Sequence, residues 1–256
     1  MKRLRSLLRL LRASLGESVY ERENTLCRDL GRLFSDQRDA HVTIEAAEGL
    51  SRTLVGAPRT GRSTARSLAN RLRERANSQP FGLPSRSAAD PLREAVARSA
   101  EWVPDGLAFS DIAPGLRKAY RRGRLLYRAT TGTARSADHL HEWRKRAKDA
   151  RYHTEFLQGA WAPVLGPLEG EWKNLTGLLG DGNDLTLLLH TLEEEPHLTR
   201  RLKRGNDLPT LIGARREVLW EEAKVVAARL YIDSPDAFVH RWQVYWDRWE
   251  GGRTSV

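Results

Sequence analysis

The sequence predicts an all-α protein, and the pattern of its hydrophobic residues carries that prediction. Nearly every periodic segment repeats its apolar residues at helical spacing. No segment alternates apolar and polar residues over the length of a half-buried strand. With 256 residues, the chain can bury a full core, as one long domain or as two small ones.

Proline, glycine and serine mark the ends of the predicted helices in order along the chain. Gly56-Ala57-Pro58 closes the third helix, and the Pro/Ser/Gly-rich stretch 78–91 is the most flexible loop. Pro163 follows the helix that starts near residue 137. Ser234 and Pro235 form an N-cap with proline at the first helical position. Helices are therefore expected at residues 2–15, 18–34, 37–53, 64–77, 90–103, 110–130, 137–160, 168–179, 184–194, 208–231 and 236–249.

The composition is strongly basic and rich in arginine. The net charge is +10 and the pI is about 10.1. Seven of the 43 basic residues are lysines, which leaves 43 − 7 = 36 arginines. A guanidinium group can bind two phosphate oxygens at once, which favours a phosphate-bearing partner. A GC-rich genome raises the arginine content as well, so composition alone does not decide for phosphate.

The cysteine count and the hydropathy pattern exclude several classes of protein. Cys27 is the only cysteine, so an internal disulfide and a cysteine-based zinc site are excluded. This fits a reducing compartment, and we expect a cytoplasmic protein. No apolar run approaches the roughly 18 residues that a membrane span needs. We expect no membrane association, no bound metal and no cofactor.

The stretch from His141 to Tyr152 has two opposed faces if it is helical. At about 100° per residue, five of its basic residues and Tyr152 fall within an arc of roughly 120°. Trp143, Ala147 and Ala150 lie on the opposite side, together with Leu140, Leu157 and Trp161. Like charges at this spacing repel one another, and Glu155 is the one acid among them, which predicts an anion from outside the chain. We call these residues the His141 face: His141, Arg144, Lys145, Lys148, Arg151 and Tyr152.

The N-terminal segment has the same design, which predicts an internal duplication. Lys2, Arg5, Arg9 and Arg12 share one face, opposite the leucines 4, 7, 8, 11 and 15. Lys2 and Arg5 match Lys148 and Arg151 at an offset of 148 − 2 = 146 residues. A second block, Cys27–Asp39, matches Trp172–Asp184 at an offset of 172 − 27 = 145 residues. Duplication explains both matches better than chance, although a leucine-rich basic sequence aligns easily with itself. The second block pairs Arg28 with Lys173, Leu30 with Leu175, Leu33 with Leu178, Asp36 with Asp181 and Asp39 with Asp184.

Four ordered elements resemble the CHAD family, the conserved histidine α-helical domain. The main element is His141-xx-Arg144-Lys145-xx-Lys148-xx-Arg151-Tyr152. The sequence LGDGND at residues 179–184 follows it, and residues 116–124 resemble the basic helix that precedes the histidine helix. Residues 229–249 resemble the closing helices of the family, so the resemblance covers nearly the whole chain.

The resemblance implies two antiparallel four-helix-bundle repeats with pseudo-twofold symmetry, which we place at residues 1–104 and 105–256. It implies that their basic faces meet in a groove or pore that binds inorganic polyphosphate without catalysis. It also suggests localisation on polyphosphate granules and a triphosphatase-domain partner. In the first repeat the counterparts of His141, Arg144 and Lys145 would precede Met1, and about 40 residues would be missing. We therefore expect an incomplete N-terminal repeat, for which a homodimer would be one way to compensate.

The expected polyphosphate contacts come from both halves of the chain. Arg117, Arg121 and Arg124 are spaced i, i+4, i+7, and we call them the Arg117 face. A linear polyphosphate has no bases or sugars that a protein could recognise by specific contacts. Rows of cations on helices therefore suffice to bind it. The full expected set is Lys2, Arg5, Arg9, Arg28, Arg117, Arg121, Arg124, His141, Arg144, Lys145, Lys148, Arg151 and Lys173.

Two other functions stay open at this point. A nucleic-acid-binding protein would also be basic and arginine-rich, but we rank nucleic acid below polyphosphate as a partner. A metal-dependent phosphohydrolase acting on polyphosphate or nucleotides could use Asp181, Asp184 or Glu155. We favour a helix N-cap and arginine pairing for the two aspartates. The stripe of Trp242, Trp246 and Trp249 is typical of a core rather than of a platform for bases.

Overall fold

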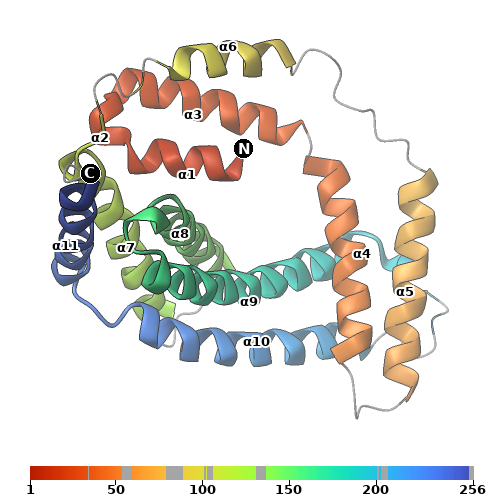
Figure 1. The fold of residues 1–256 in the computed structure, drawn as a ribbon. Helices are drawn as coiled ribbons and strands as arrows, with labels where there is room; N and C mark the ends of the chain where they lie inside the picture. The colour runs from red at the N-terminus through yellow and green to blue at the C-terminus, as the bar shows by residue number, and fades with distance from the viewer. Residues whose placement is uncertain are drawn as a thin grey trace. The chain divides into compact units, whose positions relative to one another are not determined.

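The computed structural model describes residues 1–33, 35–53, 59–78, 89–100, 102, 106–130, 137–200, 202 and 207–253. Within these ranges the chain forms eleven α-helices and no strand, which confirms the all-α prediction (Figure 1). The predicted break at Gly56–Pro58, most of the predicted loop 78–91 and the division near residue 104 lie outside the described residues. The helices are α1 (Lys2–Leu10), α2 (Arg12–Leu15), α3 (Glu17–Arg32), α4 (Ser35–Thr53), α5 (Arg59–Ser78), α6 (Ala89–Ser99), α7 (Phe109–Thr130), α8 (Ala137–Phe156), α9 (Ala162–Glu194), α10 (Leu208–Leu230) and α11 (Pro235–Arg253).

Three predicted helices are shorter than expected, and the one predicted at 90–103 ends at Ser99. The helix predicted at 2–15 is interrupted at Leu11, where φ is −86° and ψ is 2°, and this bend separates α1 from α2. The helix predicted at 137–160 ends at Phe156, and a 3-10 turn (Gln158–Ala160) follows it. Trp161 therefore leaves the apolar face on which the longer helix would place it. Its side chain is 46 % exposed and packs edge-on against Tyr245, with ring centroids 4.9 Å apart.

The helices predicted at 168–179 and 184–194 are one continuous helix, α9. The sequence Gly180-Asp181-Gly182-Asn183 looked like a break because an interior glycine costs about 1 kcal/mol relative to alanine. Burial of Leu179, Leu185, Leu188 and Leu192 on either side of it offsets that cost.

Side-chain caps fix the starts of two helices. Asp111 Oδ2 accepts a hydrogen bond of 2.9 Å from the backbone N–H of Ala108, just before α7 begins. Ser234 Oγ accepts one of 3.1 Å from the N–H of Ala237, and Pro235 is the first residue of α11. The N-cap predicted at Ser234 is confirmed.

The contacts divide the chain into two compact units, each built from separated segments. Unit 1 comprises Met1–Arg32, Pro84–Gly177 and Lys224–Val256, and unit 2 comprises Leu33–Leu83 and Leu178–Ala223. The proposed halves 1–104 and 105–256 concern a sequence duplication rather than these units, and they stay a prediction. No described helix is both long enough and apolar enough to cross a bilayer.

Unit 1 is organised around aromatic side chains from α7, α8, α9 and α11. Tyr120 of α7 stacks on Phe238 of α11, with ring centroids 3.8 Å apart. Trp172 of α9 meets Tyr231 edge-on at 5.2 Å, and Tyr127 packs against Trp143 of α8 at 5.6 Å. Trp242 and Trp246 are buried here as well, which confirms their predicted place in the core, whereas Trp249 is only half-buried. In Figure 1, α1 lies beside α3, and α7 beside α8.

Two glycines of α7 let neighbouring segments approach closely. A Cβ atom at position 115 would lie 2.7 Å from the Cα of Leu10, so the end of α1 crosses α7 with backbone against backbone. A Cβ atom at position 123 would lie 3.0 Å from the ring of Tyr231. The first contact sets the path of the chain at the bend between α1 and α2, where Leu11 departs from helical geometry.

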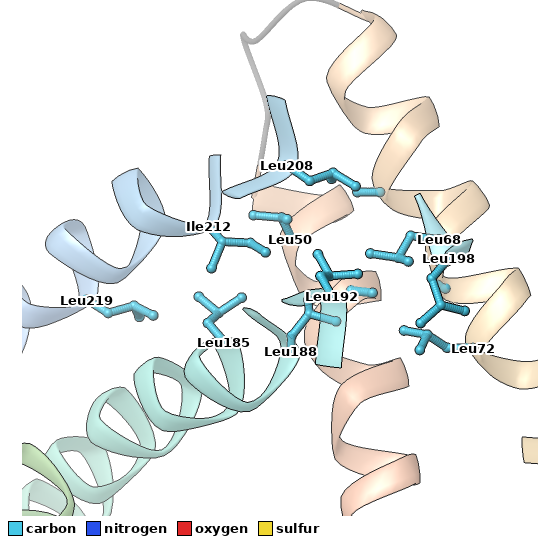
Figure 2. Close-up of a cluster of buried hydrophobic side chains, with 13 residues drawn as sticks. Leu50, Leu68, Leu72, Leu185, Leu188, Leu192, Leu198, Leu208, Ile212 and Leu219 are labelled. Carbon is cyan, nitrogen blue, oxygen red and sulfur yellow. The ribbon is translucent and has the colours of Figure 1, made fainter. Parts of the chain in front are cut away.

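Unit 2 has a separate leucine-rich core (Figure 2). The α4–α5 hairpin packs its apolar side onto parts of α9 and α10, and Figure 2 shows these side chains converging. Arg71 of α5 donates hydrogen bonds to the carbonyl oxygens of Leu198 (2.9 Å) and Arg200 (2.7 Å), which fixes the turn after α9. The labelled core side chains are Leu50, Leu68, Leu72, Leu185, Leu188, Leu192, Leu198, Leu208, Ile212 and Leu219.

Candidate functional site

All predicted anion contacts lie in unit 1, and α8 carries the densest group of them. Trp143, Ala147 and Ala150 are buried, as predicted for the side opposite the His141 face. On the His141 face itself, His141 and Lys145 are exposed, whereas Arg144, Lys148 and Arg151 are half-buried. The apolar side and the basic face predicted for this helix are therefore both present.

Internal carboxylates contact part of the His141 face. Arg151 Nε donates to Glu169 Oε1 of α9 at 2.7 Å, and Lys145 Nζ to Glu142 Oε1 at 2.5 Å. Glu155 binds Arg3 of α1 at 2.6 Å. The sequence showed one acid near this face, but folding adds Glu169 from another helix. Such partly exposed ion pairs contribute only about 0–1 kcal/mol each, so a polyanion can compete for the cations.

A second group of predicted contacts forms where α1 packs on α3. Arg5 Nε donates to Asn24 Oδ1 at 3.0 Å. Partial burial, together with the charges of Arg9 and Arg28, lowers the pKa of Arg5, so these three guanidinium groups share one neighbourhood. Arg28 also pairs with Asp29 at 2.9 Å, and Lys2 is exposed at the start of α1.

The Arg117 face is directed toward the α10–α11 corner. Arg117 pairs with Asp236 of α11, and Arg124 Nε donates to the carbonyl oxygen of Tyr231 at 3.0 Å. Arg121 between them is exposed. Arg117 and Arg124 thus bind partners within the fold. These partners lie at the α10–α11 corner and not on α8, the helix of the His141 face. Lys173 is exposed on α9, one helical turn beyond Glu169.

The contact between α1 and α8 is antiparallel and polar. Arg9 Nη1 lies 2.8 Å from Asp149 Oδ1, and Arg146 Nη1 lies 2.8 Å from Asp149 Oδ2. His153 is fully buried, and its Nε2 lies 3.0 Å from the carbonyl oxygen of Ser6. Burial lowers the pKa of His153, since the charged form cannot be hydrated there. We call this contact the α1–α8 seam.

A basic cavity of about 150 Å³ opens beside the α1–α8 seam. Its floor is Gly115 and Ala119 of α7, and Tyr20 of α3 also lines it. We call it the Lys118 cavity, and its charged lining consists of Arg9, Arg12, Lys118, Arg122, Arg146 and Asp149. Of the predicted contacts, only Arg9 belongs to this lining. A sequence pattern that could have indicated this cavity is the pair of cations Lys118 and Arg122, spaced i, i+4. It lies beside two small residues with the same spacing, Gly115 and Ala119.

Two further cavities contain none of the predicted contacts. An apolar one of about 870 Å³ lies in unit 1 between α1, α8 and the end of α11. Another, of about 370 Å³, lies in unit 2 and includes Asp181 and Asp184. Both aspartates lie inside α9, so the N-cap role expected for them is wrong. Among the described residues, no cluster of three or more histidine, cysteine, aspartate or glutamate side chains could hold a metal ion.

Comparison with known protein families decides the classification. Residues 1–193 match the model of the CHAD domain, which is about three quarters of the chain. The chain belongs to the CHAD family. The match includes the His141 face and the sequence at 179–184, and it ends before the resemblance that we noted at residues 229–249. No curated protein and no solved structure matches the chain.

Proposed function

We propose that this CHAD domain binds inorganic polyphosphate through basic faces of unit 1, without catalysis. The observation that carries the proposal is the His141 face on α8, in a chain whose residues 1–193 match the CHAD domain. Arg144, Lys145, Lys148 and Arg151 are the leading contacts, and His141 donates a hydrogen bond to a phosphate oxygen. The remaining expected contacts extend the surface along α1, α3, α7 and α9. We place the protein in the cytoplasm, on polyphosphate granules.

The geometry of a helix suits a repeating anion. Residues one turn apart rise by about 5.4 Å, so successive cations can contact successive parts of a phosphate chain. Arg144, Lys148 and Arg151 follow this spacing on α8. Each phosphate contact releases counterions from the polyanion, which supplies a large part of the binding free energy at low salt.

Pairs of equivalent contacts support two repeats with pseudo-twofold symmetry. Arg5 binds Asn24, and Arg151 binds Glu169. At the offsets found in the sequence, Arg151 is the counterpart of Arg5 (5 + 146 = 151), and Glu169 is the counterpart of Asn24 (24 + 145 = 169). Arg5 of α1 and its counterpart Arg151 of α8 thus contact equivalent positions of α3 and α9.

The α1–α8 seam supports the same symmetry. At the 146-residue offset, Asp149 is the counterpart of Arg3 (3 + 146 = 149), and Glu155 is the counterpart of Arg9 (9 + 146 = 155). The ion pair Arg3–Glu155 therefore corresponds to the ion pair Arg9–Asp149, with the two helices interchanged. Reciprocal contacts of this kind are the signature of a twofold axis. We propose that this axis passes through the seam near Ser6 and relates the two halves of a duplicated domain.

Charge reversal on the His141 face tests the function. Lys145→Glu with Lys148→Glu should abolish retention on immobilised long-chain polyphosphate, because an attractive row of charges becomes partly repulsive. Arg151 is left unchanged because it holds Glu169. The matched control is Arg229→Glu with Arg248→Glu, two exposed cations on α10 and α11. Both double variants have a net charge of 10 − 4 = +6. Equal retention of the two variants would refute the assignment.

Nucleic acid is the second candidate, favoured by the net charge of +10 and by the 36 arginines. Competition at physiological salt separates the two ligands. Long-chain polyphosphate should displace bound RNA or duplex DNA, and the reverse displacement should fail. Equal displacement in both directions would favour a general polyanion-binding protein. A triphosphatase-domain partner and a homodimer stay predictions.

A further inference from the structure

We propose that the Lys118 cavity is a second anion site, which takes a single phosphoryl group. The group is either free orthophosphate or the terminal phosphate of a longer chain. The cavity uses other faces of α7 and α8 than the polyphosphate contacts do. Arg122 is rotated by roughly 140° from Arg117, and Arg146 by roughly 140° from His141. The inference goes beyond the proposed function and does not rest on it, although Arg9 belongs to both sets of residues.

The size of the cavity selects a small ligand. Its volume of about 150 Å³ corresponds to about five water molecules at roughly 30 Å³ each. Orthophosphate has five non-hydrogen atoms arranged as a compact tetrahedron, so one such group fills the space. Gly115 lines the cavity where the backbones of α1 and α7 touch, which limits the extent of the cavity on that side.

The charge of the cavity selects an anion. Five cations and one carboxylate line it, which gives 5 − 1 = +4. Glu17 pairs with Arg12, Nε to Oε2 at 2.9 Å, and lowers the balance to +3. Asp149 is shared by Arg9 and Arg146. Lys118 and Arg122 have no carboxylate within 4.0 Å in the described part of the chain, so they are left to bind a ligand.

Three of the five cationic groups, those of Arg9, Arg12 and Arg146, are held in place before a ligand arrives. Asp149 fixes Arg9 and Arg146, and its side chain is only 4 % exposed. The guanidinium of Arg12 lies over the ring of Tyr20, 4.3 Å from its centroid, and Glu17 holds its other side. A site that is already ordered loses less conformational entropy on binding, which raises its affinity for a small ligand.

Calorimetric titration with sodium orthophosphate at constant ionic strength tests the proposal. The wild-type protein should bind one phosphate saturably. Lys118→Gln with Arg122→Gln should weaken binding by about tenfold or more, because two charge-assisted hydrogen bonds are lost. The matched control is Arg229→Gln with Arg248→Gln, which has the same net charge of 10 − 2 = +8 and should bind as the wild type does. Wild-type affinity in the Lys118/Arg122 variant would overturn the proposal.

Two further measurements keep the test decisive. If the Lys118/Arg122 variant does not fold, the wild-type protein labelled with ¹⁵N is titrated instead. The Nε–H signals of Arg9 and Arg122 should then shift with orthophosphate while that of Arg248 stays constant, and the opposite pattern would contradict the site. The Lys145→Glu/Lys148→Glu variant should still bind orthophosphate, which separates this site from polyphosphate retention.

Competition identifies the source of the phosphoryl group. Linear tripolyphosphate has two chain ends, whereas cyclic trimetaphosphate has none. Displacement of orthophosphate by the linear compound alone would support recognition of chain ends. Displacement by neither compound would support a site for free orthophosphate. If both compounds displace orthophosphate equally, the cavity does not select a single phosphoryl group, and the proposal is wrong.

Discussion

His153 shows how one residue makes the fold sensitive to pH. It is fully buried in the α1–α8 seam, and Arg9 and Arg146 lie near enough for their charges to oppose its protonation. Asp149 and the carbonyl of Ser6 act in the other direction, but burial outweighs both and the pKa of His153 is lowered from its ordinary value near 6.5. A neutral His153 protonated at Nε2 donates its hydrogen bond to Ser6.

We expect the free energy of unfolding to fall as the pH drops below about 6.5. With a lowered pKa in the folded state, the unfolded chain binds the proton more readily, so acid favours unfolding. One such group contributes a slope of up to about 1.4 kcal/mol per pH unit. Urea denaturation between pH 7.5 and pH 5.5 measures it.

Replacing the side chain identifies the group responsible. His153→Gln should remove most of the slope, whereas His240→Gln, at an exposed position on α11, should keep it. A His153→Gln protein with an unchanged slope would show that another group titrates.

At the scale of helices, two glycines that look alike in the sequence have opposite roles. Gly115 lies where the end of α1 crosses α7, and Gly182 lies in α9 with open space around its Cα. The helical pattern identifies neither role, because each depends on the segment that packs against the glycine.

Substituting each glycine by alanine should change stability in opposite directions. Gly115→Ala should lower the free energy of unfolding by about 1–3 kcal/mol, because the added methyl group overlaps the backbone of Leu10. Gly182→Ala should raise it by about 0.5–1 kcal/mol, because alanine restricts the unfolded chain and clashes with nothing. Chemical denaturation of the two variants and the wild type measures both effects, and a change of the same sign in both would contradict this account.

The helices were predictable from sequence because their apolar residues repeat with the helical period. The buried side of α8 at Trp143, Ala147 and Ala150 followed from that period alone. The continuity of α9 did not follow from it. Gly180 and Gly182 are typical of a helix break, and only the packing of the leucines around them keeps the helix continuous.

The Lys118 cavity was not predictable for a related reason. A helical wheel separates polar from apolar sides, but it does not say which polar residues meet a partner. Arg146, Asp149 and His153 form a third side of α8. Asp149 and His153 are buried and Arg146 is half-buried, because α1 packs there from about 140 residues earlier in the chain. The residues of α8 that carry the family resemblance all belong to the His141 face, and none of them lies on this side.

For the whole molecule, binding to polyphosphate should depend steeply on salt. If the four leading cations of α8 each contact one phosphate, a slope of about −0.7 per contact gives roughly −2.8 in a plot of log K against log salt. Affinity should then fall roughly 50-fold between 50 mM and 200 mM salt. Titrations at several KCl concentrations measure the slope, and a slope near zero would show that charge does not dominate.

The α1–α8 seam also discriminates between pairings. Two α1 helices brought together in the same antiparallel register would set Arg3 against Arg9, and two α8 helices would set Asp149 against Glu155. Both homotypic pairs are repulsive, whereas the mixed pair is attractive at both ends. The charges of the seam therefore favour the pairing of α1 with α8, so a second copy of the chain can engage the seam only if its α1 replaces the α1 already there.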